Sequence, residues 1–200
     1  SPDEEESCVK RSVRSIVILT LLVLGVLSTM EASRIYLKAV LAQFLLEKSW
    51  SDAQNGMHDV KPWPWADTWP VARLSSLKHN QDMIVLAGAT GRTLAFGPAY
   101  LLASAIPGET GNTVVVGHRD THFAFLKNLK SGELLQLESV DGIQHDYRVT
   151  GTAVVHESAT EVMALGDQKK LTLITCFPFD ALVPGGPLRY VVVAVSDTAG

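Results

Sequence analysis

A single cysteine ends an apolar, β-branched run near the C-terminus, and an arginine opens the next such run. In "KLTLITCFPFDALVPGGPLRY", residues 170–190, Cys176 ends the first run and Arg189 opens the second, thirteen residues later. The thiolate form of cysteine is a strong nucleophile, but it needs a base or a positive neighbour to form at neutral pH. His118 ends a third apolar run, "TVVVGH". These residue types predict nucleophilic chemistry if the fold brings the three run ends together.

The three groups suit acyl transfer. The sulfur of Cys176 can attack a carbonyl carbon and hold the acyl group as a thioester. An imidazole titrates near neutral pH, so His118 can return a proton to a leaving amine. Arg189 stays charged and cannot act as the base. Its guanidinium can instead donate hydrogen bonds to the substrate carbonyl or to the oxyanion that develops from it.

The segments around these residues resemble the sortase family of cysteine transpeptidases. "TLITC" followed by an arginine on a final strand is similar to the family pattern Thr-Leu-x-Thr-Cys, a loop, then Arg. "GNTVVVGHRDTHFAFLKNLKSGE" resembles the family's histidine segment, in which Gly-His-Arg precedes an aromatic run and a Lys-x-Gly-Asp/Glu turn. The resemblance covers residues 63–195. "KPWPWADTWPVARL" is similar to the start of the subgroup found in Gram-negative proteobacteria, class GN.

The resemblance implies an activity and a site. Sortases cut a sorting signal of the Leu-Pro-x-Thr-Gly type between Thr and Gly, hold the new acyl end on the cysteine and pass it to an amine. The protein partner is then a substrate that bears such a C-terminal signal, and the acceptor amine stays open. Carried over by position, six residues are assigned: His118, Cys176 and Arg189 as catalytic, and Thr175, Phe177 and Pro178 as substrate-positioning.

Two other functions are compatible with the same residues. A cysteine peptidase would hydrolyse the same acyl-enzyme, because only the access of water to the thioester separates hydrolysis from transfer. A membrane-tethered barrel that only binds peptides would carry Cys176 as a small buried apolar residue, as many free cysteines are. The joint pattern of Cys176, His118 and Arg189 favours catalysis.

The histidine segment raises two further interpretations. His118 and His122 stand four residues apart, as zinc ligands on a helix do, but "TVVVGH" is a strand pattern that Gly117 interrupts. Without a convincing third ligand the sequence predicts no metal site, and the acyl transfer requires no organic cofactor. Arg119 and Asp120 are predicted to form a solvated turn with a weak surface pair. The alternative, that one of them tunes the imidazole, stays open.

The run ends must be positioned by strands. From residue 71 onward, short β-branched runs alternate with turn residues, which predicts an all-β barrel or sandwich; the resemblance implies an eight-stranded β-barrel with short helices. The expected strands are 72–77, 83–88, 113–118, 133–139, 147–155, 170–175 and 189–195. Residues 97–108 are predicted to form a short helix or turn. So are residues 158–166, where Ser158 and Glu161 are spaced like a capping box.

An uncharged segment near the N-terminus predicts a membrane anchor. Residues 15–30, "SIVILTLLVLGVLSTM", lie at the short end of the roughly 17–25 residues that span a bilayer. Basic residues just before it favour a cytoplasmic N-terminus. The alternative is a cleaved signal peptide, for which "LSTMEAS" is a poor cleavage site. We expect a single-pass protein of the inner membrane whose catalytic domain faces the periplasm.

The segment after the anchor has two parts. Apolar residues in 35–45 recur with helical spacing, so we expect the anchor helix to continue and to pack on the domain. Residues 51–70 contain Asn-Gly, several prolines and three tryptophans, which predicts a linker without a regular element. Its tryptophans, Trp63, Trp65 and Trp69, are each expected to dock.

Composition sets further limits. The 200 residues carry a formal net charge of −4 without a basic cluster, so no nucleic-acid partner is expected. Cys8 and Cys176 flank the apolar segment, so they are not expected to pair. The expected division of the chain is a tail at 1–14, an anchor at 15–30, a helix and linker at 31–62, and the barrel at 63–200.

Overall fold

The computed structural model describes residues 2–181, 183 and 185–196, without the side chains of residues 2–13, 15 and 16. The chain forms two compact units, Ser1–Gln43 and Phe44–Gly200. One helix, α1 (Pro2–Gln54), runs through the boundary between them. The first unit is therefore helical, and the last eleven residues of α1 belong to the second unit, which holds all the strands.

Helix α1 contains the predicted anchor. Residues 17–54 are long and apolar enough to cross a membrane, by length and composition. The apolar residues of 17–30 expose about half to two thirds of their side-chain surface, which suits a helix surrounded by lipid. The helix continues past residue 45 as expected. It ends after Gln54, ahead of Gly56 at φ +90, so the prediction that residues 51–54 lack a regular element is wrong.

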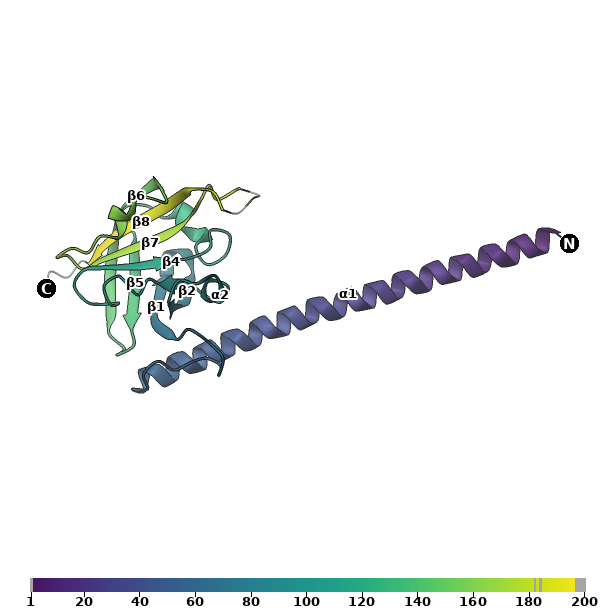
Figure 1. The fold of residues 1–200 in the computed structure, drawn as a ribbon, viewed down its shortest axis with the longest axis horizontal. Helices are drawn as coiled ribbons and strands as arrows, with labels where there is room; N and C mark the ends of the chain where they lie inside the picture. Colours follow the sequence, from purple (N-terminus) through teal and green to yellow (C-terminus); the bar gives the residue numbers. More distant parts are fainter. Residues whose placement is uncertain (1, 182, 184, 197–200) are drawn as a thin grey trace. The chain divides into compact units, whose positions relative to one another are not determined.

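The second unit is a closed eight-stranded β-barrel, as predicted (Figure 1). The strands follow the order β1-β2-β3-β4-β7-β8-β6-β5 around the barrel. The pairs β2–β3 and β4–β7 are parallel and the remaining pairs are antiparallel. The strands are β1 (Pro70–Ser76), β2 (Gln81–Ala87), β3 (Ala99–Tyr100), β4 (Asn112–Val116), β5 (Leu134–Ser139), β6 (Gln144–His156), β7 (Lys170–Phe177) and β8 (Leu188–Ser196). The short helices are η1 (Leu77–His79), α2 (Gly91–Leu94), η2 (Ala124–Asn128) and η3 (Thr160–Met163).

Two local predictions are only partly right. Residues 97–108 contain a turn, closed by a 2.9 Å hydrogen bond from the N–H of Ser104 to the carbonyl of Leu101, but also the two-residue strand β3, which is too short to show the alternation of a strand in its sequence. Helix η3 begins after Ala159 without a side-chain cap. Ser158 instead makes a 2.8 Å hydrogen bond with Nδ1 of His156, so its hydroxyl serves the end of β6 and not the helix.

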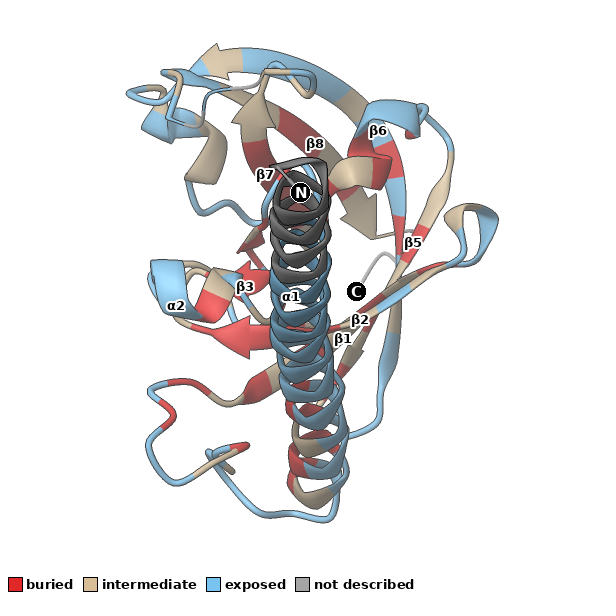
Figure 2. Ribbon diagram, turned by 90° about the vertical axis from the view of Figure 1, so that its right-hand side faces the viewer, coloured by how far each residue is buried: buried red, intermediate tan, exposed pale blue. Residues whose placement is uncertain are grey.

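Apolar side chains fill the barrel and also cover part of its outside. In Figure 2 the buried positions lie mainly on the strands. Side chains such as Leu74, Val85, Leu137 and Leu173 form the interior. A second cluster is built on Val114, Ile174 and Val191, and Val155, Val162 and Met163 are among the side chains packed against it. The strands β4, β7 and β8 are therefore buried on both faces, which explains their continuous apolar runs.

The end of α1 is part of the barrel unit. Leu46 and Trp50 are buried against Ile84 and Leu86 of β2, and Trp63 packs against the same cluster. Trp63 also meets Phe96 edge-on, with ring centroids 4.8 Å apart. The helix therefore packs on the domain through its end, from Leu46 onward, and not through the apolar residues of 35–45 on which the prediction rested, since residues such as Phe44 are exposed. Docking of every tryptophan is not observed, because Trp65 is 83% exposed.

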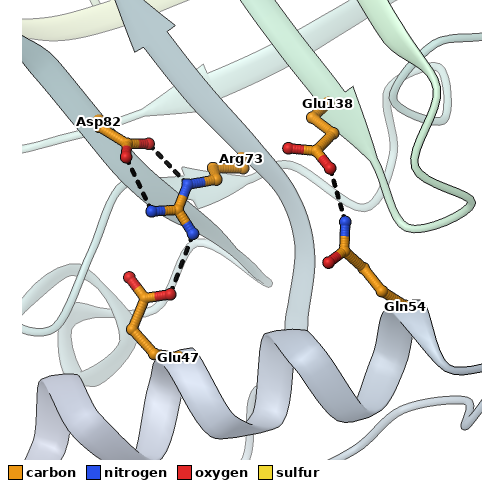
Figure 3. Close-up of polar contacts among 5 residues, drawn as sticks. All are labelled: Glu47, Gln54, Arg73, Asp82 and Glu138. Atoms are coloured by element: carbon orange, nitrogen blue, oxygen red, sulfur yellow. Dashed lines mark hydrogen bonds and ion pairs between the residues drawn. The ribbon is translucent and has the colours of Figure 1, made fainter.

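Polar contacts fix the same helix end (Figure 3). Arg73 of β1 forms two hydrogen bonds of 2.7 Å to the carboxylate of Asp82, and a third of 3.0 Å to Glu47 on α1. Gln54 donates a 2.6 Å hydrogen bond to Glu138 of β5. The two carboxylates raise the pKa of Arg73 above its ordinary value, chiefly through the hydrogen bonds to Asp82. The helix end is thereby tied to both β1 and β5.

Candidate active site

Cys176 and Arg189 lie directly opposite one another in the sheet. Strands β7 and β8 are antiparallel neighbours, and the Cα atoms of these two residues are paired in their register. Side chains paired in this way leave the same face of the sheet, with Cβ atoms about 4.5–5.5 Å apart. The thirteen residues that separate the two along the chain therefore form a hairpin that brings a thiol and a guanidinium together.

His118 reaches the same end of the sheet from the other side of β7. Strand β4 runs parallel to β7, and Val116 is paired with Ile174. The pairing continues one residue beyond the strand, because the N–H of Gly117 donates a 3.1 Å hydrogen bond to the carbonyl oxygen of Ile174. His118 comes next and is exposed. The three predicted catalytic residues thus lie at the ends of three adjacent strands, β4, β7 and β8.

The site belongs to the outside of the barrel. Side chains on a strand alternate between its two faces. Cys176 shares a face with Ile174, and Arg189 shares a face with Val191. Both neighbours belong to the outer apolar cluster and are themselves buried, at 8% and 1% exposure, so the thiol and the guanidinium lie next to a packed apolar cluster on the outside of the barrel.

Thr175 has a structural contact that its position next to the cysteine did not reveal. Its side chain is 2% exposed, and its hydroxyl donates a 2.7 Å hydrogen bond to the carbonyl oxygen of Gly117. Gly117 also approaches Phe123 closely, because a Cβ atom at residue 117 would lie 2.8 Å from the ring. The backbone that carries His118 is therefore held by β7 on one side and by an aromatic ring on the other.

Phe177 and Pro178 lie just past the cysteine. The ring of Phe177 stacks on Tyr190 with centroids 6.3 Å apart, and Phe179 meets Tyr190 edge-on at 5.1 Å. Phe177 is half-buried, while Pro178 is exposed and follows a cis peptide bond. Phe179 and Tyr190 pack against the interior cluster, so the aromatic trio fixes the start of the loop between β7 and β8 from the face opposite Cys176.

The prediction that Arg119 belongs to a solvated turn is wrong. Arg119 is only 9% exposed, and its Nη2 donates hydrogen bonds of 2.8 Å to the carbonyl of Ala181 and 3.2 Å to that of Val183. Its Nη1 is buried without a hydrogen-bond partner among the described residues. The guanidinium ties the turn after the histidine to the loop after the cysteine. A contact between two loops so far apart in sequence has no local signal.

Glu157 was also missed by the sequence analysis. Its carboxylate forms a 2.6 Å ion pair with Nη2 of Arg189. Nη1 of the arginine donates hydrogen bonds of 2.6 Å to the carbonyl of Gly186 and 2.9 Å to that of Leu188. The signal for this contact is the pairing of β6 with β8, which places Val155 opposite Arg189 and Glu157 just beyond. That pairing is not visible in a single sequence.

The second histidine of this segment lies in a turn. The N–H of Phe123 donates a 2.9 Å hydrogen bond to the carbonyl of His118, which closes a turn and not a helix around His122. Burial lowers the pKa of His122, and the charge of the neighbouring His118 lowers it further. Among the described residues, no group of three or more metal-ligating side chains is found.

Comparison with known proteins matches this chain and its fold to one family. The family model for the sortase domain matches residues 76–197. A curated relative, Sortase D of Bacillus subtilis (strain 168), is 32% identical over 116 residues, which are 58% of this chain and 58% of the relative. The chain therefore spans less than two thirds of the length of that relative.

Solved structures agree in fold. Sortase A from Corynebacterium diphtheriae matches with a TM-score of 0.61 at 26% identity, over 68% of this chain and 64% of that one. The Sortase D5 transpeptidase of Clostridium perfringens matches with a TM-score of 0.64 at 20% identity, over 78% of this chain and 98% of that one. The second likeness concerns the fold alone.

Proposed function

The chain belongs to the sortase family, and on that premise we propose that it is a cysteine transpeptidase in which Cys176, His118 and Arg189 carry out acyl transfer. The observation that supports this proposal most directly is the Cα pairing of Cys176 with Arg189 at the end of β7 and β8. The turn that carries His118 is hydrogen-bonded to β7 at the same end. The proposed nucleophile, proton carrier and oxyanion donor therefore lie at the same end of three adjacent strands.

The reaction follows from these groups. The thiolate of Cys176 attacks the carbonyl carbon of the scissile peptide bond, and the carbonyl electrons move to the oxygen, which accepts hydrogen bonds from Arg189. When the carbon–nitrogen bond breaks, protonated His118 gives its proton to the leaving amine. An acceptor amine then attacks the thioester and loses a proton to His118. The thiolate of Cys176 leaves, and the new amide bond is complete.

The substrate in this proposal is a protein with a sorting signal of the Leu-Pro-x-Thr-Gly type. The half-buried apolar side chains at the margin of the outer cluster, such as Leu101 and Val116, could contact the leucine and proline of such a signal. Pro178 is exposed just past the cysteine and could contact the peptide, whereas Phe177 leaves the opposite face of β7 from Cys176 and would position the substrate only indirectly, through the loop. Thr175 is buried, so it would position the substrate only indirectly, through the turn that carries His118.

Helix α1 serves as the membrane anchor in this proposal. The candidate span at residues 17–54 supports it, and the basic residues before the apolar segment favour a cytoplasmic N-terminus. The catalytic unit would then face the periplasm of a Gram-negative cell if the class GN resemblance holds. Membrane fractionation and protease accessibility of intact spheroplasts test this placement. Recovery of the barrel in the cytoplasm would contradict it.

The test of the activity is to trap the acyl-enzyme. The chain is incubated with a Leu-Pro-x-Thr-Gly peptide, and the modified residue is identified by mass spectrometry. A thioester on Cys176, and its absence in Cys176→Ala, is the expected result. Release of the cleaved peptide by Cys176→Ala at the wild-type rate would refute the proposal.

Hydrolysis is the second outcome that the same residues allow. If an added amine such as triglycine appears in the product, the enzyme transfers the acyl group. If the product carries a free carboxylate at every amine concentration, the enzyme is a peptidase. A protein that only binds peptides would give neither product, and Cys176 would react with iodoacetamide no faster than an ordinary exposed cysteine.

A further inference from the structure

The backbone places a carboxylate beside the proposed oxyanion donor. Glu157 directly follows β6, whose last residue, His156, is paired with Leu188. The N–H of Glu157 donates a 2.7 Å hydrogen bond to the carbonyl of Pro187, which extends the β6–β8 pairing by one step. The Glu157 carboxylate then forms its 2.6 Å contact with Nη2 of Arg189. The position of the carboxylate is therefore set by the sheet and not by a mobile loop.

Three of the five N–H donors of Arg189 are used within the protein. The two carbonyls of Gly186 and Leu188 accept both hydrogens of Nη1, and Glu157 accepts one hydrogen of Nη2. Among the residues that the structure describes, none accepts a hydrogen bond from Nε or from the second hydrogen of Nη2, so both can serve a ligand. An arginine side chain has several rotatable bonds, so its guanidinium would take many orientations without such contacts. The contacts on Nη1 and Nη2 together define its plane.

The ion pair between Glu157 and Arg189 contributes too little energy to matter for folding, so its role is better explained by the orientation of the guanidinium. The side chain of Glu157 is 52% exposed and that of Arg189 is 26% exposed. An ion pair with this exposure contributes about 1 kcal/mol or less to folding. The same contact matters far more to a reaction in which hydrogen-bond donors must be in place before charge develops on the substrate oxygen.

We propose that Glu157 is a positioning residue that orients the guanidinium of Arg189 for the developing oxyanion. This inference rests on the proposed function, because it assigns Arg189 the role of oxyanion donor. Glu157 does not contact the reacting atoms and acts through the arginine. An acyl transfer that depends on Arg189 therefore depends on the charge and the reach of the side chain at residue 157.

The test compares Glu157→Gln with wild type on a Leu-Pro-x-Thr-Gly peptide. Glutamine keeps the shape and loses the charge, so the guanidinium is held less firmly. We expect kcat to fall by roughly ten- to hundred-fold, as misplacement of a catalytic group does, while KM changes less than threefold. Glu161→Gln is the matched control, because it removes an exposed carboxylate four residues further along the same loop. Its kcat should equal that of wild type.

A double-mutant cycle separates positioning from a merely structural effect. If Glu157 acts through Arg189, Glu157→Gln should cause little further loss of kcat in an Arg189→Lys background. Equal losses in both backgrounds would overturn the proposal. So would a higher kcat for Glu157→Gln, because then the carboxylate would be competing with the substrate for the arginine.

A measurement without substrate distinguishes this inference from the proposed function. Side-chain NMR of ¹⁵N-labelled arginine reports whether the Arg189 guanidinium rotates. We expect slowly rotating Nη groups in wild type and in Glu161→Gln, and averaged signals in Glu157→Gln. If the chain transferred no acyl group at all, the proposed function would be refuted. The spectra would still show whether Glu157 holds the guanidinium of Arg189 in one orientation. Averaged Arg189 signals in wild type would overturn the inference itself.

Discussion

Thr175 donates a 2.7 Å hydrogen bond to the carbonyl of Gly117, so the residue before the cysteine holds the residue before the histidine. The bond crosses between β7 and the segment that extends β4, and Thr175 is buried at 2% exposure. Cys176 and His118 are therefore each one residue away from the two ends of this hydrogen bond. Their relative position depends on a side chain that need not touch the substrate.

Thr175→Val should impair both stability and catalysis. Valine has nearly the same shape but leaves the buried carbonyl of Gly117 without its partner, which costs about 1–3 kcal/mol. We expect a lower melting temperature and a reduced kcat, because the turn with His118 can shift. Thr175→Ser keeps the hydroxyl and is the control. A Thr175→Val enzyme with wild-type kcat would show that this bond does not position the histidine.

Arg119→Met should loosen the loop between β7 and β8. The buried guanidinium binds the carbonyls of Ala181 and Val183, and methionine removes these donors while keeping most of the volume. If the loop forms a wall of the peptide site, KM for the sorting peptide should rise by roughly tenfold, the equivalent of about 1.4 kcal/mol of binding. Limited proteolysis should cut the loop faster than in wild type.

The matched control for Arg119 is Arg92→Met in helix α2, where the arginine is exposed. The rate at which Cys176 reacts with iodoacetamide is a second measurement. This reagent is too small to need contacts with the loop between β7 and β8. The rate should be nearly the same in Arg119→Met and in wild type. If Arg119→Met changed neither KM nor the rate of proteolysis, the contact of Arg119 with the loop between β7 and β8 would not contribute to peptide binding.

The places of the three candidate catalytic residues were easier to predict from sequence than the contacts that support them. Cys176, His118 and Arg189 each end or open an apolar run, so their places at strand ends could be read locally. The closed barrel then brings the ends of β4, β7 and β8 together. Arg119 and Glu157 have partners 62 and 32 residues away, and such contacts depend on tertiary structure alone.

The prediction of secondary structure from sequence was wrong where an element was short or where two sequence signals competed. Strand β3 has two residues and shows no periodicity, so its segment was predicted to be helix or turn. The capping-box spacing at Ser158 was misleading because the hydroxyl bonds to His156 instead. At Ser51–Gln54 the helix persists against the turn residues that follow, since Trp50 and Ala53 are buried in the barrel unit.

Glu133 should make the folded state sensitive to acid. Hydrogen bonds from Lys78 and then His79 lower its pKa from 4.5 to about 2. Its side chain is 8% exposed, and both contacts are 2.7 Å. A carboxyl group whose folded-state pKa is lowered stabilises the fold above the unfolded-state value of 4.5, and this contribution is lost as the pH falls toward 2.

The measurement is the melting temperature of wild type and Glu133→Gln between pH 7 and pH 2.5. At pH 7 the variant should be less stable by about 1–2 kcal/mol, since Lys78 is largely exposed and its charge is screened. The difference should shrink as the pH falls below the 4.5 of an ordinary glutamate. A difference that stays constant down to pH 2.5 would mean that the ion pair is not its source.

The barrel unit should require the end of α1 for its full stability. Leu46 and Trp50 are buried at 1% and 4% exposure, and Arg73 links Glu47 to Asp82 (Figure 3).

A fragment that begins at residue 63 lacks the end of α1 and exposes Ile84 and Leu86. A fragment that begins at residue 44 keeps it. We expect the longer fragment to be more stable, and Trp50→Ala in that fragment to cost about 3–5 kcal/mol, the usual loss for a buried large aromatic side chain. Urea unfolding of the two fragments measures the difference; equal midpoints would mean that the barrel is complete without the helix.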